Sequence, residues 1–271
     1  MRNTLKSFTT FGIGGPAKRI ETAASRSALI DLSAEGTVLG RGSNILASDS
    51  GVDGVIVINR FERVLRSGNY VYAGSGTRLS VLCGALCELG LSGMEWAIGI
   101  PGTVGGAVRM NAGAFLGCMS DVVEHVEIVR EHRVMTLNKS EIGFGYRTSG
   151  LLPGDTVIGA TFKLTPDSPI AVRRRCDRYN VLRKNSQPVG RSAGSVFKNP
   201  PHVSVGKILD EAGLKGLRRG GAVISDKHAN IIVNTGGATA KDVCALIEVM
   251  RGVLEDNGVA AQEEIIYLGD F

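Results

Sequence analysis

The sequence predicts an α+β fold built from two or three compact units. A single domain usually spans about 100–200 residues, and this chain has 271. Hydrophobic residues make up 43% and charged residues 21%, a composition that fills cores and excludes a disordered chain. The 37 glycines stand in short runs, which indicates tight turns and close approaches of the backbone to a ligand.

The first sixty-odd residues have the pattern of a small βαβ-type lobe. Residues Ala17–Ala24 alternate as a strand does, and Ser25 is expected to cap a helix over Arg26–Ala34. β-Branched runs predict further short strands at Thr37–Leu39, Gly54–Ile58 and Val71–Ala73.

The middle of the chain predicts an α+β lobe. Leu79–Leu89 is apolar at helical spacing, whereas Met94–Gly113 is rich in glycine and has little periodicity. A hairpin is expected around Glu131-His132. Its strands would be Val122–Val129 and Val134–Leu137, and a further strand is expected at Thr156–Leu164.

A third unit is expected to begin near Gln187-Pro188. The preceding helix, Ala171–Lys184, carries many arginines and is best interpreted as a solvated face that also adds positive potential for phosphates. The predicted elements of the third unit are a helix at Val205–Ala212, a strand at Asn230–Val233, a helix at Ala240–Asp256 and a strand at Glu264–Leu268.

Charge and cysteine usage narrow the class of protein. The net charge of +5 suits anionic small molecules and also nucleic acid, but a nucleic-acid role would need aromatic residues along the basic helix, where only Tyr179 stands. The five cysteines form no C-x-x-C, which favours free thiols in a reducing cytosol. The four histidines lack metal-ligand spacing, so no metal site is expected.

The sequence predicts a soluble cytoplasmic protein. Its first ten residues lack the apolar stretch of a signal peptide, and no apolar run reaches the roughly 18 residues of a membrane helix. We therefore expect no membrane insertion. The sequence leaves the oligomeric state open and favours a monomer.

An early glycine motif resembles a dinucleotide-binding site but stands in the wrong context. Gly12–Ala17 matches G-x-G-x-x-A, and Asp31 and Glu35 follow at a suitable distance. A Rossmann site needs a strand before the glycines and a helix after them. Lys6–Thr10 is a poor strand, and the segment after Pro16 predicts a strand, so a tight turn is favoured.

Two later glycine-rich loops favour a nucleotide ligand. Gly40–Asn44 follows a predicted strand, and its backbone N–H groups could form a nest for a pyrophosphate, with Ser43 and Asn44 as extra donors. Ile100–Ala107 and Asn111–Gly113 form the second dense loop. Each loop could instead be an ordinary turn or a packed crossover, but together they favour one shared ligand.

These loops resemble the FAD-binding fold of the vanillyl-alcohol-oxidase/PCMH type, and the chain resembles the UDP-N-acetylenolpyruvoylglucosamine reductases, the MurB family, over nearly its full length. The matching segments are Thr9–Gly15, Gly40–Asn44, Pro101–Gly113, Phe144–Ser149, Gly194–Pro200 and Glu264–Gly269. The resemblance implies a two-lobed PCMH-type FAD-binding domain over residues 1–166, with lobes of about 1–66 and 67–166. A smaller α+β substrate-binding domain would cover residues 167–271. The chain is most similar to the compact subgroup, which lacks a substrate-capping insertion.

The resemblance also implies roles for particular residues. Arg147 would bind the substrate carboxylate, Ser195 would donate a proton and Glu264 would be the third catalytic group. The implied FAD-binding residues are Gly40, Arg41, Gly42, Ser43, Asn44, Ile45, Pro101, Gly102, Thr103, Gly105, Gly106, Asn111, Ala112 and Gly113. The implied substrate-binding residues are Tyr146, Lys198 and Asn199, with Asn199 on the diphosphate. Lys184, at the end of the basic helix, is expected from its charge to contact a phosphate of the substrate.

The activity that this resemblance implies is an NADPH-dependent reduction of an enolpyruvyl ether on a UDP-linked amino sugar, which gives UDP-N-acetylmuramate for peptidoglycan synthesis and cell-wall biogenesis, and so for cell shape and division. Two alternatives stay open: a PCMH-type flavin oxidase for another small molecule, and a non-enzymatic basic protein that binds nucleic acid.

The sequence departs from the family pattern at several positions. Arg109-Met110 precedes Asn111, Cys118 stands where an acidic residue is common, and Gln262-Glu263 replaces a more usual acid-proline pair. The choice of Glu264 over Glu263 therefore rests on counting back from Tyr267-Leu268-Gly269. Without the resemblance, Glu264 would be interpreted as a strand-edge charge, Ser195 as a turn hydroxyl and Arg147 as a solvated side chain.

Overall fold

The computed structural model describes residues 4–271 and divides into two compact units, each discontinuous in sequence. The central unit comprises Ile20–Arg41 and Val55–Arg183. The C-terminal unit comprises the described residues up to Arg19 together with Gly42–Gly54 and Lys184–Phe271. The predicted domains follow chain order with a boundary at 166/167, whereas early segments of the chain belong to the compact C-terminal unit. The predicted division of FAD-binding and substrate-binding roles stays a prediction.

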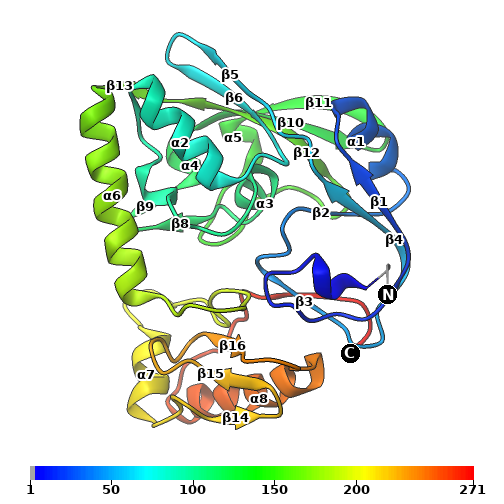
Figure 1. The fold of residues 1–271 in the computed structure, drawn as a ribbon, viewed down its shortest axis with the longest axis vertical. Coiled ribbons are helices and arrows are strands. Elements are labelled where there is room, and N and C mark those ends of the chain that lie inside the picture. The colour runs from blue at the N-terminus through cyan, green and yellow to red at the C-terminus, as the bar shows by residue number, and fades with distance from the viewer. Residues whose placement is uncertain (1–3) are drawn as a thin grey trace. The chain divides into compact units, whose positions relative to one another are not determined.

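A five-stranded antiparallel sheet organises the central unit (Figure 1). In sheet order its strands are β11 (Arg133–Asn138), β10 (Val123–Arg130), β12 (Thr156–Lys163), β6 (Tyr70–Gly74) and β5 (Val64–Ser67). Arg130 lies opposite Arg133, and Glu131 and His132 between them have φ of 47° and 62°. Two such left-handed residues form a tight hairpin turn, so the predicted hairpin is confirmed.

Helices cover both faces of this sheet. On one face, Ile128 of β10 and Phe162 of β12 share a core with Leu82 of α2 (Leu79–Leu89) and Val104 of α3 (Val104–Arg109). On the other face, Val129 and Ile158 pack with Leu29 of α1 (Arg26–Ser33). In β10 this division follows from the alternation of side chains, and in β12 a register shift beside Glu127 and Ile128 turns Ile158 to the face opposite that of Phe162. The hydroxyl of Ser25 accepts the Ala28 N–H at 3.1 Å, which confirms the predicted cap of α1.

Smaller elements complete the central unit and its connections. A three-stranded sheet has the order β1 (Ala17–Ala23), β4 (Val52–Asn59) and β2 (Thr37–Leu39), with β2 and β4 parallel. Two short pairs join β7 (Leu91–Ser92) to β13 (Thr165–Pro166), and β8 (Gly113–Ala114) to β9 (Gly117–Cys118). The short helices are η2 (Glu95–Ala97), α4 (Met119–Val122) and α5 (Lys139–Ile142).

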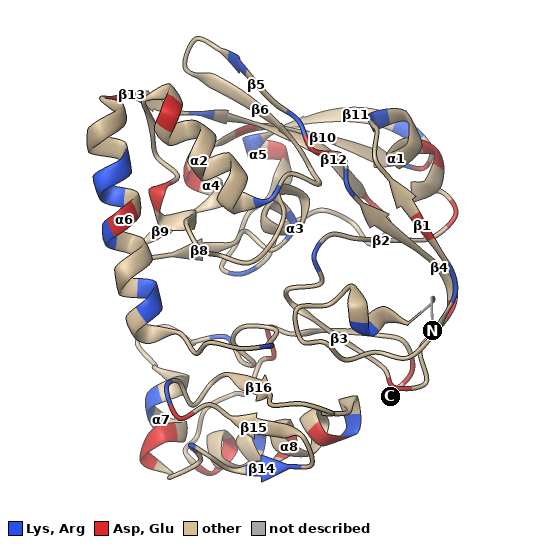
Figure 2. Ribbon diagram, in the orientation of Figure 1, with Lys and Arg blue, Asp and Glu red and all other residues tan. Residues whose placement is uncertain are grey.

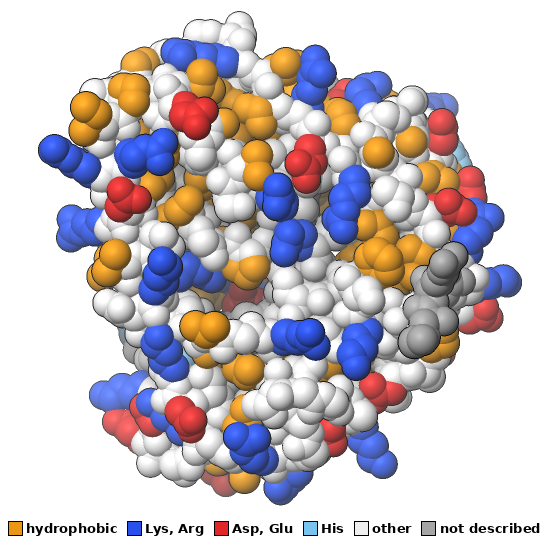
Figure 3. Space-filling view, viewed as in Figure 1, with side chains coloured by type: hydrophobic (Ala, Val, Ile, Leu, Met, Phe, Trp, Pro, Cys, Tyr) orange, Lys and Arg blue, Asp and Glu red, His pale blue; other side chains and the backbone are white. Residues whose placement is uncertain are grey.

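The long helix α6 (Pro169–Ser186) carries the basic residues that the sequence placed on a solvated face (Figure 2). Arg173, Arg174 and Arg178 are exposed, whereas Val172 and Cys176 are buried. Arg175 pairs with Glu95 at 2.8 Å and with Asp167 at 2.5 Å. In the space-filling view, Lys and Arg side chains gather on the side of the molecule where α6 lies (Figure 3).

The C-terminal unit is built around a three-stranded antiparallel sheet, β14 (Arg218–Arg219), β15 (Ala222–Ile224) and β16 (Ile232–Asn234). Helices α7 (Val205–Glu211) and α8 (Ala240–Asp256) share its core, and strand β17 (Ile266–Leu268) pairs in parallel with β3 (Ile45–Ala47). Phe11, Ile13 and Leu46 are buried in the same core. Segments from both ends of the chain therefore build this unit.

The early glycine motif begins at the end of a turn, in which the Gly12 N–H donates to the Thr9 carbonyl at 3.2 Å, and it continues as an irregular segment. A short 3₁₀ helix, η1 (Leu5–Ser7), precedes the motif, and strand β1 follows it. Gly12 and Gly14 have φ of 66° and 138°, and a Cβ on Gly14 would lie 2.8 Å from the Cβ of Ala47. The helix start that a dinucleotide site needs after its glycines is replaced by a strand.

Two predicted features differ from the structure. The glycine-rich passage contains helix α3, which the sequence did not predict, and the last strand begins at Ile266 rather than at Glu264. Glu264 instead lies in the extended segment that precedes the strand. Among residues 4–271, no helix combines the length and the apolar character needed to cross a membrane.

Candidate active site

The two glycine-rich loops meet within the central unit at Gly40 and Thr103. A Cβ on Gly40 would lie only 2.4 Å from the Thr103 hydroxyl oxygen, so glycine lets the Thr103 side chain pack directly against the backbone at residue 40. The second loop is held at its start because the Leu79 N–H donates to the Gly102 carbonyl at 3.1 Å. The two loops therefore lie beside each other at this contact, and their shared ligand stays a prediction.

The first turn of α3 leaves one stretch of backbone open. Val104 N–H donates to the Thr77 carbonyl and Gly105 N–H to the Ser75 carbonyl, each at 2.9 Å. A Cβ on Gly106, in contrast, would meet no described atom within 4 Å apart from its chain neighbours and the backbone of its own helix. A ligand can approach the backbone closely at Gly106, which is the arrangement that a nucleotide cofactor requires. The open space beside the Gly106 backbone is therefore compatible with FAD binding at this loop.

Arg147 is held against the last part of the same loop. Its Nη2 donates to the Gly113 carbonyl at 2.8 Å, and the Asn111 amide donates to the Gly145 carbonyl at 2.9 Å. Arg147 has φ of 53°, a left-handed conformation that is uncommon for a residue other than glycine. Such strained residues cluster at functional sites, and they persist where the surroundings hold them in place.

Tyr146 and Ser149 flank Arg147 with different exposures. Tyr146 is 54% exposed, and its ring centroid lies 5.1 Å from the Arg147 guanidinium carbon. The Ser149 hydroxyl donates to the Arg109 carbonyl at 2.7 Å. Burial lowers the pKa of Arg109, whose guanidinium donates to the Asp155 carbonyl. The backbone of residue 109 thus helps to fix the segment that carries Arg147, whereas the Arg109 side chain holds the Asp155 carbonyl.

In the C-terminal unit, Ser195 and Glu264 lie on neighbouring segments. The Glu264 N–H donates to the Val196 carbonyl at 2.7 Å, and the Lys198 N–H donates to the Gln262 carbonyl at 2.8 Å. These bonds make an antiparallel pairing around Phe197 and Glu263. The structure therefore brings the predicted proton donor and the predicted glutamate to adjacent backbone positions, far apart as they are in sequence.

The second half of the first glycine-rich loop lies beside both segments, again within the C-terminal unit. The Asn44 amide donates to the Glu264 carbonyl at 2.8 Å, and the Asn44 carbonyl accepts the Ile266 N–H at 2.9 Å. Thr10 connects this loop to the serine segment, because its N–H donates to the Gly42 carbonyl at 3.2 Å and its hydroxyl to the Ser192 carbonyl at 2.7 Å. Asn44 thus has a structural bond in addition to its predicted role at FAD.

Asn230 is a supporting residue that sequence reasoning did not single out. Its side chain accepts the Phe197 N–H at 3.0 Å and donates to the Phe197 carbonyl at 2.8 Å, and it is 1% exposed. Its carbonyl also accepts the Val196 N–H at 2.8 Å. A polar amide opening an apolar run was the available signal, since a buried amide must find partners.

The predicted substrate-binding residues of the C-terminal unit have mixed environments. The Asn199 side-chain oxygen accepts the Val205 N–H at 3.0 Å at the start of α7, a bond that does not use its amide nitrogen. Lys198 is half-buried and Lys184 is exposed. The Lys184 carbonyl accepts a hydrogen bond from the Lys227 ammonium at 2.5 Å.

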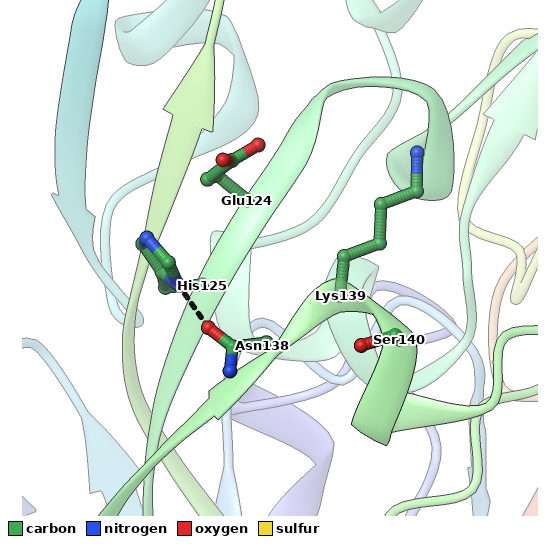
Figure 4. A pocket seen from close by; sticks show the side chains of 5 residues that line it. All are labelled: Glu124, His125, Asn138, Lys139 and Ser140. Carbon is green, nitrogen blue, oxygen red and sulfur yellow. Dashed lines mark hydrogen bonds between the residues drawn. The ribbon is translucent and has the colours of Figure 1, made fainter.

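A separate depression of about 390 Å³ lies where β10 and β11 meet α5 (Figure 4). It is lined by Glu124, His125, Asn138, Lys139 and Ser140, none of which is a predicted site residue. His125 contacts the Asn138 side chain at 3.0 Å, and the Asn138 N–H donates to Glu141 at 2.7 Å at the start of α5. These polar groups stabilise the hairpin and the helix start.

Comparison with known families agrees with these observations. A model described as "FAD binding domain" matches residues 23–132, and one described as "UDP-N-acetylenolpyruvoylglucosamine reductase, C-terminal domain" matches residues 185–268. The reductases from Caldicellulosiruptor bescii and Geobacter metallireducens are each 40% identical, covering 98% and 97% of this chain and 90% and 91% of their own. The solved reductase (MurB) from Thermus caldophilus has a TM-score of 0.89 and 40% identity, over 98% of this chain and 97% of that one.

The fold and the two matched models define a class of protein, an FAD-binding domain joined to a reductase C-terminal domain. Within that class, the chain belongs to the UDP-N-acetylenolpyruvoylglucosamine reductase family. The α+β fold class expected from the sequence is confirmed.

Proposed function

We propose that this protein is an FAD-dependent reductase that oxidises NADPH and reduces the enolpyruvyl group of UDP-N-acetylenolpyruvoylglucosamine to UDP-N-acetylmuramate in peptidoglycan synthesis. Family membership supports this assignment. The observation that carries it is the pairing of the Glu264 N–H with the Val196 carbonyl, which sets Ser195 and Glu264 on adjacent segments. An oxidase has no use for a proton donor to carbon.

FAD would be held by the residues of the two glycine-rich loops, 40–45 and 101–113, and when bound it supplies hydride transfer between NADPH and the substrate. The open backbone at Gly106 and the close contact of Gly40 with Thr103 support this placement. Ser43 offers a hydroxyl donor, and one N–H of the Asn44 amide already bonds the Glu264 carbonyl.

The catalytic side chains would stabilise charge and move one proton. Negative charge develops on the carbon next to the substrate carboxylate and on the carboxylate itself. The Arg147 guanidinium would bind this carboxylate with two parallel hydrogen bonds and hold the growing charge. Glu264, if protonated, would donate a hydrogen bond to the same group, and the Ser195 hydroxyl would protonate the adjacent carbon.

The remaining binding roles complete the proposal. Tyr146, Lys184, Lys198 and Asn199 would contact the UDP-linked substrate, with Asn199 at the diphosphate. The FAD-binding domain would span residues 1–166 and the substrate-binding domain 167–271. The protein would act in the cytoplasm as a monomer.

Mixing the purified protein with NADPH and enolpyruvyl-UDP-GlcNAc tests the function. We expect a yellow protein whose NADPH consumption depends on the sugar nucleotide and yields UDP-N-acetylmuramate. NADPH consumption that ignores the sugar nucleotide would reject the reductase and favour the flavin oxidase. A colourless protein whose melting temperature does not rise with added FAD would favour the nucleic-acid-binding alternative.

A further inference from the structure

An ion pair lies directly beside the predicted catalytic glutamate in sequence. Arg251, on helix α8, contacts the Glu263 carboxylate through its Nη2, and its Nη1 donates to the Ala261 carbonyl at 3.3 Å. Both contacts fall on the extended segment that leads to Glu264. Arg251 therefore ties the backbone of this segment, and not only one side chain, to α8.

The pairing geometry fixes which way Glu263 points. Phe197 and Glu263 are opposite residues, and the hydrogen bonds flank them on either side, from Lys198 to Gln262 at 2.8 Å and from Glu264 to Val196 at 2.7 Å. In such a non-hydrogen-bonded pair the two side chains are close together on one face. The Arg251 guanidinium carbon lies 5.7 Å from the Phe197 ring centroid, so it covers that face.

Side chains alternate along an extended segment, so the face chosen for Glu263 determines the face of Glu264. With Glu263 directed to Arg251 and α8, Glu264 is directed to the opposite face. Exchanging the two glutamates would exchange their directions, because a shift of one residue reverses the pattern. The Glu263 carboxylate is engaged by Arg251, which selects Glu264 as the glutamate for the substrate.

Placing the Glu263 carboxylate here costs desolvation free energy, so folding stability alone does not explain it. Its side chain is 16% exposed, and among the described residues its Oε2 is buried without a hydrogen-bond partner. Burial and the neighbouring Glu263 raise the pKa of Tyr267, which keeps the phenol neutral beside this carboxylate. An ion pair between two partly exposed side chains adds little to folding stability, so a role in specifying geometry is the better account.

We infer that the Arg251–Glu263 pair is a positioning device that aims Glu264 at the substrate of the proposed reductase. The inference rests on the proposed function of Glu264. Arg251 and Glu263 are positioning residues, since they act through the backbone of the segment and touch neither substrate nor cofactor in this role.

The test separates the two half-reactions of the holoenzyme by stopped-flow absorbance of the flavin. In Glu263→Ala we expect oxidation of the reduced flavin by enolpyruvyl-UDP-GlcNAc to slow about 10- to 100-fold, the usual effect of a small displacement of a catalytic group. Reduction of the flavin by NADPH should change less than about twofold, because that step does not use Glu264. Arg251→Met should reproduce the effect, and the double variant should be no slower than either single one.

Two further variants test whether the contact between Arg251 and residue 263, rather than the charge of Glu263 or another partner of Arg251, causes the effect. Glu263→Gln preserves the shape and an acceptor for Arg251, so it should recover most of the lost rate. Glu248→Gln removes another partner of Arg251, an exposed carboxylate 3.6 Å from its Nε, and should leave both half-reactions unchanged. Melting temperatures identify any variant that is simply unfolded at the assay temperature.

Each outcome decides one question. If Glu263→Ala slows both half-reactions equally, or slows neither, the positioning role is wrong and the reductase assignment stands. If Glu263→Gln is as slow as Glu263→Ala in a folded protein, the ion pair acts otherwise than by geometry and the inference fails. If the unaltered protein shows no sugar-dependent oxidation of its reduced flavin, the proposed function fails first.

Discussion

The Asn230 side chain holds the segment that carries Ser195 through the two backbone hydrogen bonds that a neighbouring strand would otherwise make. Its side chain pairs with both the N–H and the carbonyl of Phe197, and it is 1% exposed. Truncation to alanine would leave two buried backbone groups without partners, each costing about 1–3 kcal/mol. We expect Asn230→Ala to lower the free energy of unfolding by about 2–6 kcal/mol in urea titrations with an unchanged slope.

Asn257 provides the matched control for this variant. It is exposed and donates to the Val253 carbonyl at 2.8 Å at the end of α8. Because water can replace that partner, Asn257→Ala should cost under about 1 kcal/mol. Equal losses from the two variants would show that burial of the Asn230 amide is not what matters.

Ser195 is the residue whose chemical role is easiest to isolate. Ser195→Ala removes the proposed proton donor but none of the proposed contacts to NADPH. We expect flavin reduction by NADPH to persist, while oxidation of the reduced flavin by the sugar nucleotide falls by about 10²–10⁴-fold, the usual share of general acid catalysis. Stopped-flow measurement of both half-reactions provides the check, and a parallel loss in the two would contradict the role.

Local sequence patterns predict the chemical role of a residue better than they predict its hydrogen-bond partners in the fold. The sequence placed a serine and a glutamate in matching motifs, but it held no sign that the Asn44 amide would bond the Glu264 carbonyl 220 residues away. The Arg251–Glu263 pair could not be predicted from the sequence either, because side-chain partners that are distant in sequence depend on how the fold packs. Asn230 stood out only as a polar residue beside an apolar run.

At the scale of elements, an ion pair connects two neighbouring strands: Asp155 directly precedes β12, and its partner Arg130 is the last residue of β10. Arg130 donates to the two Asp155 carboxylate oxygens at 2.8 Å each and holds the pKa of that carboxyl below its usual range. A carboxyl with a depressed folded-state pKa stabilises the protein above its unfolded-state pKa of about 3.9, and this contribution is lost as pH falls through the lower folded-state value.

This sign gives a pH-dependent prediction. Asp155→Asn should melt below the unaltered protein at pH 6 by a gap that stays constant down to about pH 4 and narrows as pH falls further. Scanning calorimetry across this range measures the gap. Asp53→Asn is the control, since the Asp53 side chain is 95% exposed and 4.0 Å from Lys18, and it should give almost no gap at any pH. A gap that widened towards acid pH would contradict the assigned sign.

The elements with strong local patterns were predicted well, and those that depend on packing were not. Helix α2 occupies the predicted span Leu79–Leu89, and α8 the predicted span Ala240–Asp256. Helix α3 was missed because Gly105 and Gly106 have low helix propensity. It forms because Val104, Ala107 and Val108 are buried, so tertiary contacts outweigh local preference.

At the scale of the molecule, the C-terminal unit depends on chain segments from the beginning of the sequence. Its core includes Phe11, Ile13 and Leu46, and strand β17 pairs with β3. The Asp49 carboxylate also accepts the Ala240 and Lys241 N–H groups at 2.9 and 3.1 Å at the start of α8. The resemblance implied one FAD-binding domain over residues 1–166, and hydrophobic periodicity could not show that early segments share the C-terminal core, because it reports elements and not which elements pack together.

The same packing predicts how fragments of the chain behave. Residues 184–271 expressed alone would expose the surface that Phe11, Ile13 and Leu46 cover, and would leave β17 and the start of α8 without their partners. Burying one large apolar side chain contributes about 1.5–3 kcal/mol, and a domain's whole stability is about 5–15 kcal/mol. We therefore expect no cooperative thermal transition for the 184–271 fragment by circular dichroism.

Mixing it with a 1–183 fragment, which supplies the missing partners, should restore such a transition at a temperature that depends on fragment concentration. A lone 184–271 fragment that melts cooperatively would show that the early segments are accessories to this core rather than parts of it.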